Sequence, residues 1–503
     1  MSHLNMMMLR VLAGFLLFVA TMFTQAARAG NESDALHVIN RLSFGPAPGD
    51  KERVMAMGID AYIDEQLHPE RIPESAALTQ RLAGLTLNRA SQAELVTRFR
   101  ELNKQALENG EAGKAARQAF HRQLVEEGGA ARLLPALMSP RQLQEVMVDF
   151  WFNHFNVYQG KGLDHALVAN YEREAIQPFV LGRFRDLLGA TAHHPAMLFY
   201  LDNWLSTAPG FKPFRATDQS GVQVTGQARQ PNGLNENYAR ELMELHTLGV
   251  DGGYSQKDVT ELARILTGWT IDPRISTSGS LFVFAPRRHD DGSKEWLGYR
   301  VMGNGQAEGE WALDVLARHP STARHIAYKL AQHFVSDDPL PALVDRLAHR
   351  FRDSDGDIRS VLATLFASPE FRDPATHSAK FKNPYRYLLS SLRATGQYAP
   401  DIRLMLGTLH QQGMPLHGCP TPDGYKNTEA AWLNPDATTR RIAFATALGS
   451  GRLPGSDAGP VDEAGLRSTM GGMLGDRTRS LIDQSEPLLR SALILGSPDF
   501  IRY

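Results

Sequence analysis

The chain has 503 residues, and its 53 lysines and arginines nearly balance its 55 acidic side chains, which leaves a formal net charge of −2. A surface this close to neutral gives no electrostatic reason to expect nucleic acid or an anionic membrane as a partner. The one cysteine, Cys419, excludes an intramolecular disulfide, and its place among turn residues favours a thiol without a redox role.

The first 29 residues predict a cleaved export signal. Arg10 precedes an apolar run from Val11 to Phe23, and Ala27-Arg28-Ala29 supplies the small-x-small pattern of a cleavage site. This run is shorter than the roughly 20 apolar residues that a membrane-spanning helix needs, which disfavours the alternative of an uncleaved anchor. We therefore expect a periplasmic or secreted protein with no integral membrane segment after cleavage.

Helical periodicity dominates the rest of the chain. Ser139, Pro140 and Gln142 have the pattern that opens a helix, which we expect to end near Val157. Asn235 caps a second helix over 236–248, and Ser255 with Asp258 opens a third that ends at Thr267-Gly268. Further helices are predicted at 310–318, 322–335, 340–352, 358–366 and 384–395, with a single short strand at 281–285. The fold class is therefore all-α or nearly so: a multi-helix globular domain with one short β element and long loops.

A polar segment from Ser206 to Gly233 interrupts this pattern. It is rich in Gly, Pro, Gln, Ser and Thr, and a loop of this length inside a compact domain is typical of a lid or a binding loop. No clean linker separates independent domains. We expect one helical domain over 30–503, with lobes over 30–205 and 234–503 joined by the loop 206–233.

Several motifs match one known protein family in the same order. The longest, from Leu234 to Ile271, reads LNENYARELMELHTLGVDGGYSQKDVTELARILTGWTI; others are HVINRLSFGP from His37, DFWFNHF from Asp149 and RRHDDGSKEWLG from Arg287. Over about residues 37–445 they resemble the bacterial family catalogued as domain of unknown function 1800. The resemblance implies an exported, mostly helical protein, often encoded beside another exported protein, and it implies no reaction. The family often has a histidine where this chain has Phe152, so a metal site using that position would lack one ligand here.

The helix predicted over 236–248 carries the first candidate site. At 100° per residue, Glu241 falls inside the arc formed by Tyr238, Leu242, Leu245 and Leu248. A carboxylate in an apolar arc must be paired, metal-bound or protonated, so we predict Glu241 as a general acid/base, with a structural salt bridge as the alternative.

Other residues of this helix lie beside or opposite that arc. Asn237 and Glu244 lie at its edge, where Asn237 is a candidate for substrate binding. His246 faces away from Glu241, so the two cannot easily share one metal ion from a straight helix.

Two further segments carry candidates. His154 lies on an apolar helical stripe beside Asn153, and it is either a hydrogen-bonded core residue or an acid/base or ligand next to a substrate-binding amide. The segment after the predicted strand gathers candidates for catalysis, His289 and Asp290, and for binding an anionic or polyol substrate, Arg288 and Lys294. Its alternative is a solvated charged turn. Asp202 ends the helix before the long loop and could coordinate a cation.

Absent motifs narrow the function. The sequence has no Gly-x-Ser-x-Gly elbow, phosphate-binding glycine loop, dinucleotide fingerprint or c-type haem attachment. The leading hypothesis is an exported enzyme, hydrolase-like, that acts on an envelope or extracellular polymer through Glu241, His154, His289 and Asp290. The second is an oxidoreductase that depends on a divalent metal or non-covalent haem, with His154, His246 or His289 as ligands from different helices. Glu244 and Asp202 are further possible metal ligands. The third is a non-catalytic binding or assembly partner of the neighbouring exported protein.

Overall fold

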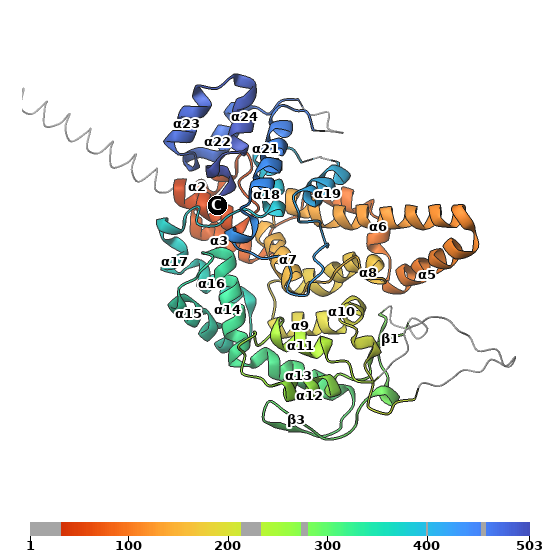
Figure 1. Ribbon diagram of the computed structural model, residues 1–503. Coiled ribbons are helices and arrows are strands. Elements are labelled where there is room, and N and C mark those ends of the chain that lie inside the picture. Colours follow the sequence, from red (N-terminus) through yellow and green to blue (C-terminus); the bar gives the residue numbers. More distant parts are fainter. Residues whose placement is uncertain (1–31, 213–232, 273–279, 399–400, 454–458) are drawn as a thin grey trace, which may run out of the picture.

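Helices make up most of the described chain, which confirms the predicted fold class (Figure 1). The computed structural model describes residues 32–212, 233–272, 280–398, 401–453 and 459–503. The predicted export signal at 1–29 and most of the predicted loop at 206–233 lie outside these residues. No described helix is both long and apolar enough to cross a membrane.

The first half of the described chain is helical throughout. After helical residues 32–42 come α2 (Asp50–Met57), α3 (Ile59–Leu67), α4 (Ala76–Ala83), α5 (Gln92–Glu108), α6 (Gly110–Met138), α7 (Gln142–His154), α8 (Asp164–Tyr171), the π-helical turn η3 (Glu172–Ile176), α9 (Phe184–His193) and α10 (Pro195–Tyr200). The helices α5 and α6 pack along one another and project from the body of the molecule (Figure 1).

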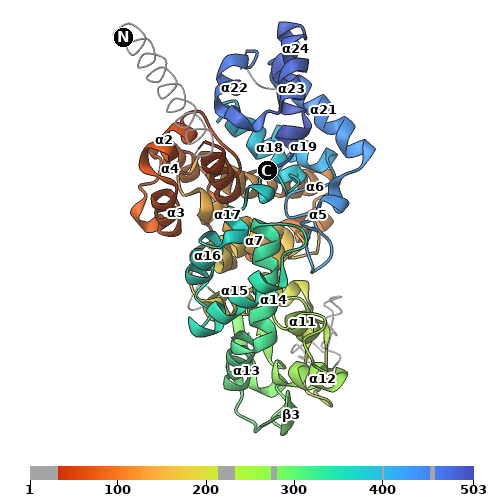
Figure 2. The same ribbon diagram turned by 90° about the vertical axis from the view of Figure 1, so that its left-hand side faces the viewer.

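The second half adds helices and two small sheets. The helices are α11 (Asn237–Glu244), α12 (Gln256–Ile265), α13 (Gln306–Arg318), α14 (Pro320–Phe334), α15 (Pro341–Asp353), α16 (Ile358–Phe366), α17 (Pro369–Arg372), α18 (Pro384–Ala394), α19 (Ile402–Gln411), α20 (Glu429–Trp432), α21 (Pro435–Gly449), α22 (Glu463–Met470), α23 (Asp476–Asp483), α24 (Pro487–Leu495) and α25 (Pro498–Ile501). Short 3-10 turns lie at Pro69–Arg71, Leu87–Arg89, Gln177–Phe179, Asn203–Leu205, Pro286–Arg288, Pro374–Thr376 and Gly471–Met473. Figure 2 shows α14, α15 and α16 side by side, and α16 also contacts α3.

Sequence signals at the starts of helices predicted helix bounds well where the full signal was present. The capping box of Ser255 and Asp258 is present at the start of α12, and α16 covers the predicted range 358–366. The helix predicted over 236–248 is shorter, because α11 ends at Glu244. Beyond it the amide of His246 bonds the carbonyl of Glu241 at 3.0 Å, which widens the turn. The prediction that His246 faces away from Glu241 assumed a straight helix, so it does not apply.

The strand predicted at 281–285 is confirmed, and three further short strands in the described chain were not predicted. The predicted strand contains β2 (Phe282–Phe284), which pairs antiparallel with β1 (Trp269–Ile271) so that Trp269 lies opposite Phe284. A second antiparallel pair joins β3 (Lys294–Trp296) to β4 (Tyr299–Val301). Strands of three residues are too short to show a period of two in the sequence, and β1 follows directly on a segment that reads as a helix end.

The helix α7 lies in the centre of the core and positions the site. Fully buried side chains occupy successive turns of it, namely Leu143, Val146, Met147, Val148 and Trp151. Because these residues point in several directions around the axis, α7 is enclosed on nearly every side. Of its two acidic side chains, Glu145 is buried and Asp149 is partly buried.

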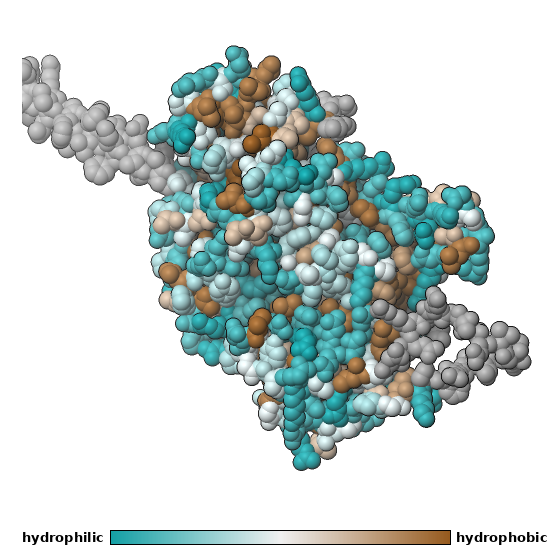
Figure 3. Space-filling model, in the orientation of Figure 1, coloured by the Kyte–Doolittle hydropathy of each residue, from teal (hydrophilic) through white to brown (hydrophobic). Residues whose placement is uncertain are grey.

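The core cluster around α7 also includes residues from both predicted lobes, such as Leu188 and Leu242. The division into lobes stays a prediction. The face seen in Figure 3 is mostly polar, with apolar residues gathered over the end of the molecule that carries α22, α23 and α24. Leu481, Leu488 and Leu489 are exposed there.

Candidate functional site

Two adjoining cavities lie beside α7 and are covered by residues 414–427, here called the covering segment. Cavity A has space for water-sized molecules of about 30 Å³ and cavity B of about 40 Å³. Both are lined by Asp149, Asn153, Met414 and Tyr425. Asp149 is the only ionisable acid among these four shared residues, so it can reach a molecule in either cavity.

Two asparagines of α7 and its C-terminal turn hold the covering segment in place. The amide of Asn153 donates to the carbonyl of Tyr425 at 2.8 Å, and its oxygen accepts from the amide of Tyr425 at 2.8 Å. Asn156 donates to the carbonyls of Thr421, at 2.8 Å, and Cys419, at 3.0 Å. The side chain of Asn153, predicted to bind substrate, is therefore occupied in fixing one wall of the cavities.

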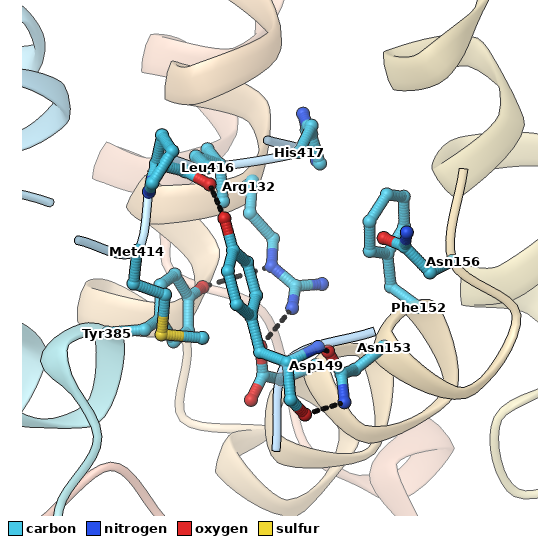
Figure 4. Close-up of a pocket in the computed structure, with 11 residues that line it drawn as sticks. Arg132, Asp149, Phe152, Asn153, Asn156, Tyr385, Met414, Leu416 and His417 are labelled. Atoms are coloured by element: carbon cyan, nitrogen blue, oxygen red, sulfur yellow. Dashed lines mark hydrogen bonds and ion pairs between the residues drawn. The ribbon is translucent and has the colours of Figure 1, made fainter. Parts of the chain in front are cut away.

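The wall of cavity A contains a network centred on Arg132 of α6 (Figure 4). The guanidinium donates from Nη2 to Asp149 Oδ1 at 2.8 Å and from Nε to the hydroxyl of Tyr385 at 3.0 Å. Its Nη1 lies 3.3 Å from Glu172 Oε2. Arg132 is 3% exposed, so its charge is compensated only by these buried neighbours.

His417 brings the covering segment into the same network. Its Nε2 lies 3.2 Å from Glu172 Oε2, and its ring contacts Phe152 with centroids 4.7 Å apart. The backbone of His417 has a φ of 54°, in the left-handed region that few residues with side chains adopt. Burial alone would raise the pKa of Glu172, but Arg132 and His417 outweigh it and hold this pKa below its usual value. Glu172 is therefore a buried carboxylate ion.

The two acids of α7 behave differently from Glu172. Burial raises the pKa of Asp149, and Arg132 opposes that shift. Only Oδ1 of Asp149 has a hydrogen-bond partner among the described residues. Burial also raises the pKa of Glu145 to about 8, with Arg132 opposing and Glu172 adding to the shift. Glu145 lines a third cavity, of about 210 Å³, together with Glu172. Acidic side chains thus lie beside Arg132 in two separate cavity walls.

Cavity B is lined by Lys329 of α14. Burial lowers the pKa of Lys329 to about 8, and Lys426 lowers it further while Asp423 opposes. Within the described part of the chain, Lys329 has neither a hydrogen-bond acceptor nor an ion-pair partner. Strongly shifted groups of this kind cluster at functional sites, where proton transfer or charge recognition needs them.

His154 also lines cavity B, but it is buried and neutral. Its Nε2 donates to the carbonyl of His246 at 3.0 Å, and burial lowers its pKa well below the usual value. The rings of His246 and His325 lie 6.2 and 6.1 Å from it. The structure therefore brings together two of the predicted metal ligands, His154 and His246. Across residues 32–503, leaving aside the undescribed gaps, no group of three or more His, Cys, Asp or Glu residues is arranged to hold a metal ion.

Glu241 does not line cavity A or B. It is half-buried on α11, and its pKa is raised by burial, by Glu244 and by Asp423, with Arg240 opposing. The other candidate residues on and beside this helix make contacts with residues other than Glu241. Asn237 donates to the carbonyl of Leu201 at 3.3 Å, Glu244 accepts from the hydroxyl of Tyr254 at 3.3 Å, and Asp202 lies 3.0 Å from Lys161.

The predicted site at 288–294 forms a separate, closed cluster around Glu308 of α13. His289 lies 3.0 Å from Glu308 Oε1 through Nε2, and its Nδ1 donates to the carbonyl of Thr267 at 2.8 Å. Lys294 donates to Glu308 Oε2 and to the carbonyl of Asp290. Burial alone would lower the pKa of His289, but the bonds to Glu308 and Thr267 raise it.

The remaining side chains of this segment are also engaged. Asp290 accepts from Arg264 at 2.8 Å, and Arg288 donates to the hydroxyl of Thr270 at 2.8 Å. None of the four predicted residues, Arg288, His289, Asp290 and Lys294, lines cavity A or B.

Sequence reasoning missed Arg132, Asp149, Glu172, Lys329 and His417. One signal was available for Asp149: it lies four residues after Glu145 on a helix that is apolar on nearly every side, where a carboxylate is costly unless it is paired. Arg132, a single cation ahead of the apolar run Leu133–Leu137, gave the same signal.

The fold and these cavities define a mostly helical protein with a buried ionic site. The sequence model of the family described as Protein of unknown function (DUF1800) matches residues 37–502, and the chain belongs to this family. This confirms the resemblance seen in its motifs. No match was found among curated proteins or among solved structures.

Proposed function

We propose that the chain is an exported enzyme that performs hydrolysis in cavities A and B, with Asp149 as the catalytic base. One observation carries this proposal: Asp149 lines both cavities, Arg132 holds one of its oxygens, and the other has no hydrogen-bond partner among the described residues. A base held in this way can act on a water molecule without first breaking a bond to the protein.

The raised pKa of Asp149 suits it to proton transfer, because a carboxylate that holds its proton more tightly is a stronger base. In this reaction Asp149 takes a proton from water, and the remaining hydroxide attacks the electrophilic carbon of the substrate. The bond to the leaving group then breaks, and Asp149 returns the proton to that group.

Tyr385 supplies a hydrogen bond to the oxygen that becomes negative. Its hydroxyl accepts from Arg132 at 3.0 Å, which leaves the hydroxyl hydrogen without an acceptor in the described structure. Burial raises the pKa of Tyr385 far above its ordinary value, so the group stays a neutral donor. A preorganised donor of this kind stabilises developing charge more than water does.

We propose in addition that the chain is exported and that its substrate is a polymer. The N-terminal pattern around Arg10 and Ala27-Arg28-Ala29 supports export, and an exported hydrolase meets envelope and extracellular polymers first. Cleavage after Ala29 is checked by mass spectrometry of the protein recovered from the periplasm and the medium. Recovery of the uncleaved chain in the membrane fraction would contradict export.

The test of the reaction is a turnover screen of the mature protein on polysaccharides, peptidoglycan and polyesters in heavy-oxygen water. Each bond that is hydrolysed places one heavy oxygen in one of its two products. We expect the Asp149→Asn variant to fold and to lose about 100-fold or more of this rate, as removal of a catalytic base does. Full activity in a folded Asp149→Asn variant would overturn the proposal.

A further inference from the structure

We propose that cavity B binds a carboxylate group through Lys329, so that the ligand of this protein is a carboxylate-bearing molecule. That this ligand is also the substrate rests on the proposed function. The binding site itself stands on the side chains that line cavity B.

The charges around cavity B leave one cation unpaired. Lys426 donates to Asp423 at 2.6 Å, and Asp149 is paired with Arg132 at 2.8 Å. Lys329 has no such partner in the described structure. Arg132 is shared between Asp149 and Glu172, so Lys329 is the cation of this cavity that no described carboxylate pairs with.

Two neutral donors on the same wall are also unused. The oxygen of Asn383 accepts from the amide of Arg386 at 2.8 Å, whereas its Nδ2 makes no hydrogen bond with described residues. His333 is 8% exposed, and its Nδ1 lies 3.2 Å from Asn427 Nδ2, which can only donate. His333 Nε2 therefore carries the hydrogen, and this buried N–H has no acceptor in the described structure. An unsatisfied buried donor is costly, and a bound acceptor would relieve it.

The balance of charge selects a carboxylate. One ammonium group and neutral N–H donors match a single negative charge shared between two oxygens. A phosphate dianion would bring a second charge close to Asp149 with no cation to meet it. Cavity B encloses about 40 Å³, so it accepts the carboxylate group itself while the rest of the ligand lies outside it.

The affinity of this site depends on the protonation of Lys329. The charged and titratable groups that face it are Lys426 and Asp423 from the covering segment, His154 from α7, His246 after α11 and His325 within α14. Burial lowers the pKa of His246 to about 3 and of His325 to about 4, so these histidines are neutral above pH 5. Because Lys329 loses its proton with a pKa of about 8, carboxylate affinity is expected to fall as the pH rises above 8.

The test is isothermal titration of the full mature protein with sodium galacturonate, with galactose and with inorganic phosphate. At pH 7 we expect galacturonate to bind, galactose and phosphate to bind more weakly, and Lys329→Met to weaken galacturonate by about tenfold or more, as loss of a charge-assisted hydrogen bond does. Lys257→Met is the matched control, because Lys257 is exposed and pairs with Glu295 on the surface. At pH 9.5 the wild type should approach the affinity of Lys329→Met.

Equal galacturonate affinity in the wild type and in Lys329→Met would overturn the inference, and so would a failure of galacturonate to bind. Tighter binding of phosphate than of galacturonate would refute the selection of a carboxylate. Asp149→Asn separates this inference from the proposed function. If that variant binds galacturonate but hydrolyses nothing, both stand; if the wild type hydrolyses a neutral polymer and binds no carboxylate, only the inference fails.

Discussion

Two buried ionic clusters, one around Glu308 and one around Arg132, are built from the same kinds of side chain but differ in what they leave free. The two oxygens of Glu308 meet His289 and Lys294, and the cluster faces neither cavity A nor cavity B. In the Arg132 cluster, one oxygen of Asp149 lies on the wall of two cavities with no hydrogen-bond partner among the described residues. A group of charged residues therefore indicates chemistry only where some of its hydrogen-bonding atoms face a cavity.

The largest expected effect comes from breaking the closed cluster. Glu308→Gln leaves the charges of His289 and Lys294 buried without a carboxylate, and we expect it to lower the free energy of unfolding by about 3–5 kcal/mol. Urea denaturation at pH 7 measures this. A loss below about 1 kcal/mol would show that Glu308 is not what stabilises this region.

An effect of opposite sign is expected in the open cluster. The pKa of Glu145 rises from 4.5 in the unfolded chain to about 8 in the folded one, so the folded state holds a proton that the unfolded state releases between these values. Stability from this group is complete below about pH 4.5 and is lost as the pH rises towards 8, by up to ~1.4 kcal/mol per pH unit.

Glu145→Gln keeps the neutral form at every pH. The variant should therefore be more stable than the wild type at pH 8, and the advantage should shrink towards pH 4.5. Thermal unfolding of both proteins across this range measures the difference. A variant that is less stable than the wild type at pH 8 would mean that Glu145 is ionised in the folded protein.

The sequence predicts features formed by neighbouring residues better than features formed by residues far apart in the chain. Short-range signals were reliable: the capping box of Ser255 and Asp258 starts α12, and α16 has the predicted bounds. The Arg132 site was not predicted, because its residues come from α6, α7, the η3 turn, α18 and the covering segment, and only tertiary packing brings them together. The charged residues at 288–294 were predicted to form a site because they are adjacent in sequence.

The smallest expected effect concerns Glu241, which the sequence favours as the acid/base. It does not line cavity A or B, so we expect Glu241→Gln to change the hydrolytic rate by less than about threefold, as is usual for residues outside the reacting site. Steady-state turnover on the substrate found by the screen measures this. A loss as large as that in Asp149→Asn would move the active site to α11.

The most direct test of the account compares two matched substitutions, Asp149→Asn in the open cluster and Asp290→Asn in the closed one. Each aspartate accepts a hydrogen bond from an arginine at 2.8 Å, so each change removes one comparable ion pair. Hydrolytic turnover of the two variants at equal folded fractions is the measurement. The account predicts that Asp149→Asn loses about 100-fold or more of the rate while Asp290→Asn keeps it. An active Asp149→Asn variant beside an inactive Asp290→Asn variant would contradict the account and place catalysis in the segment around His289.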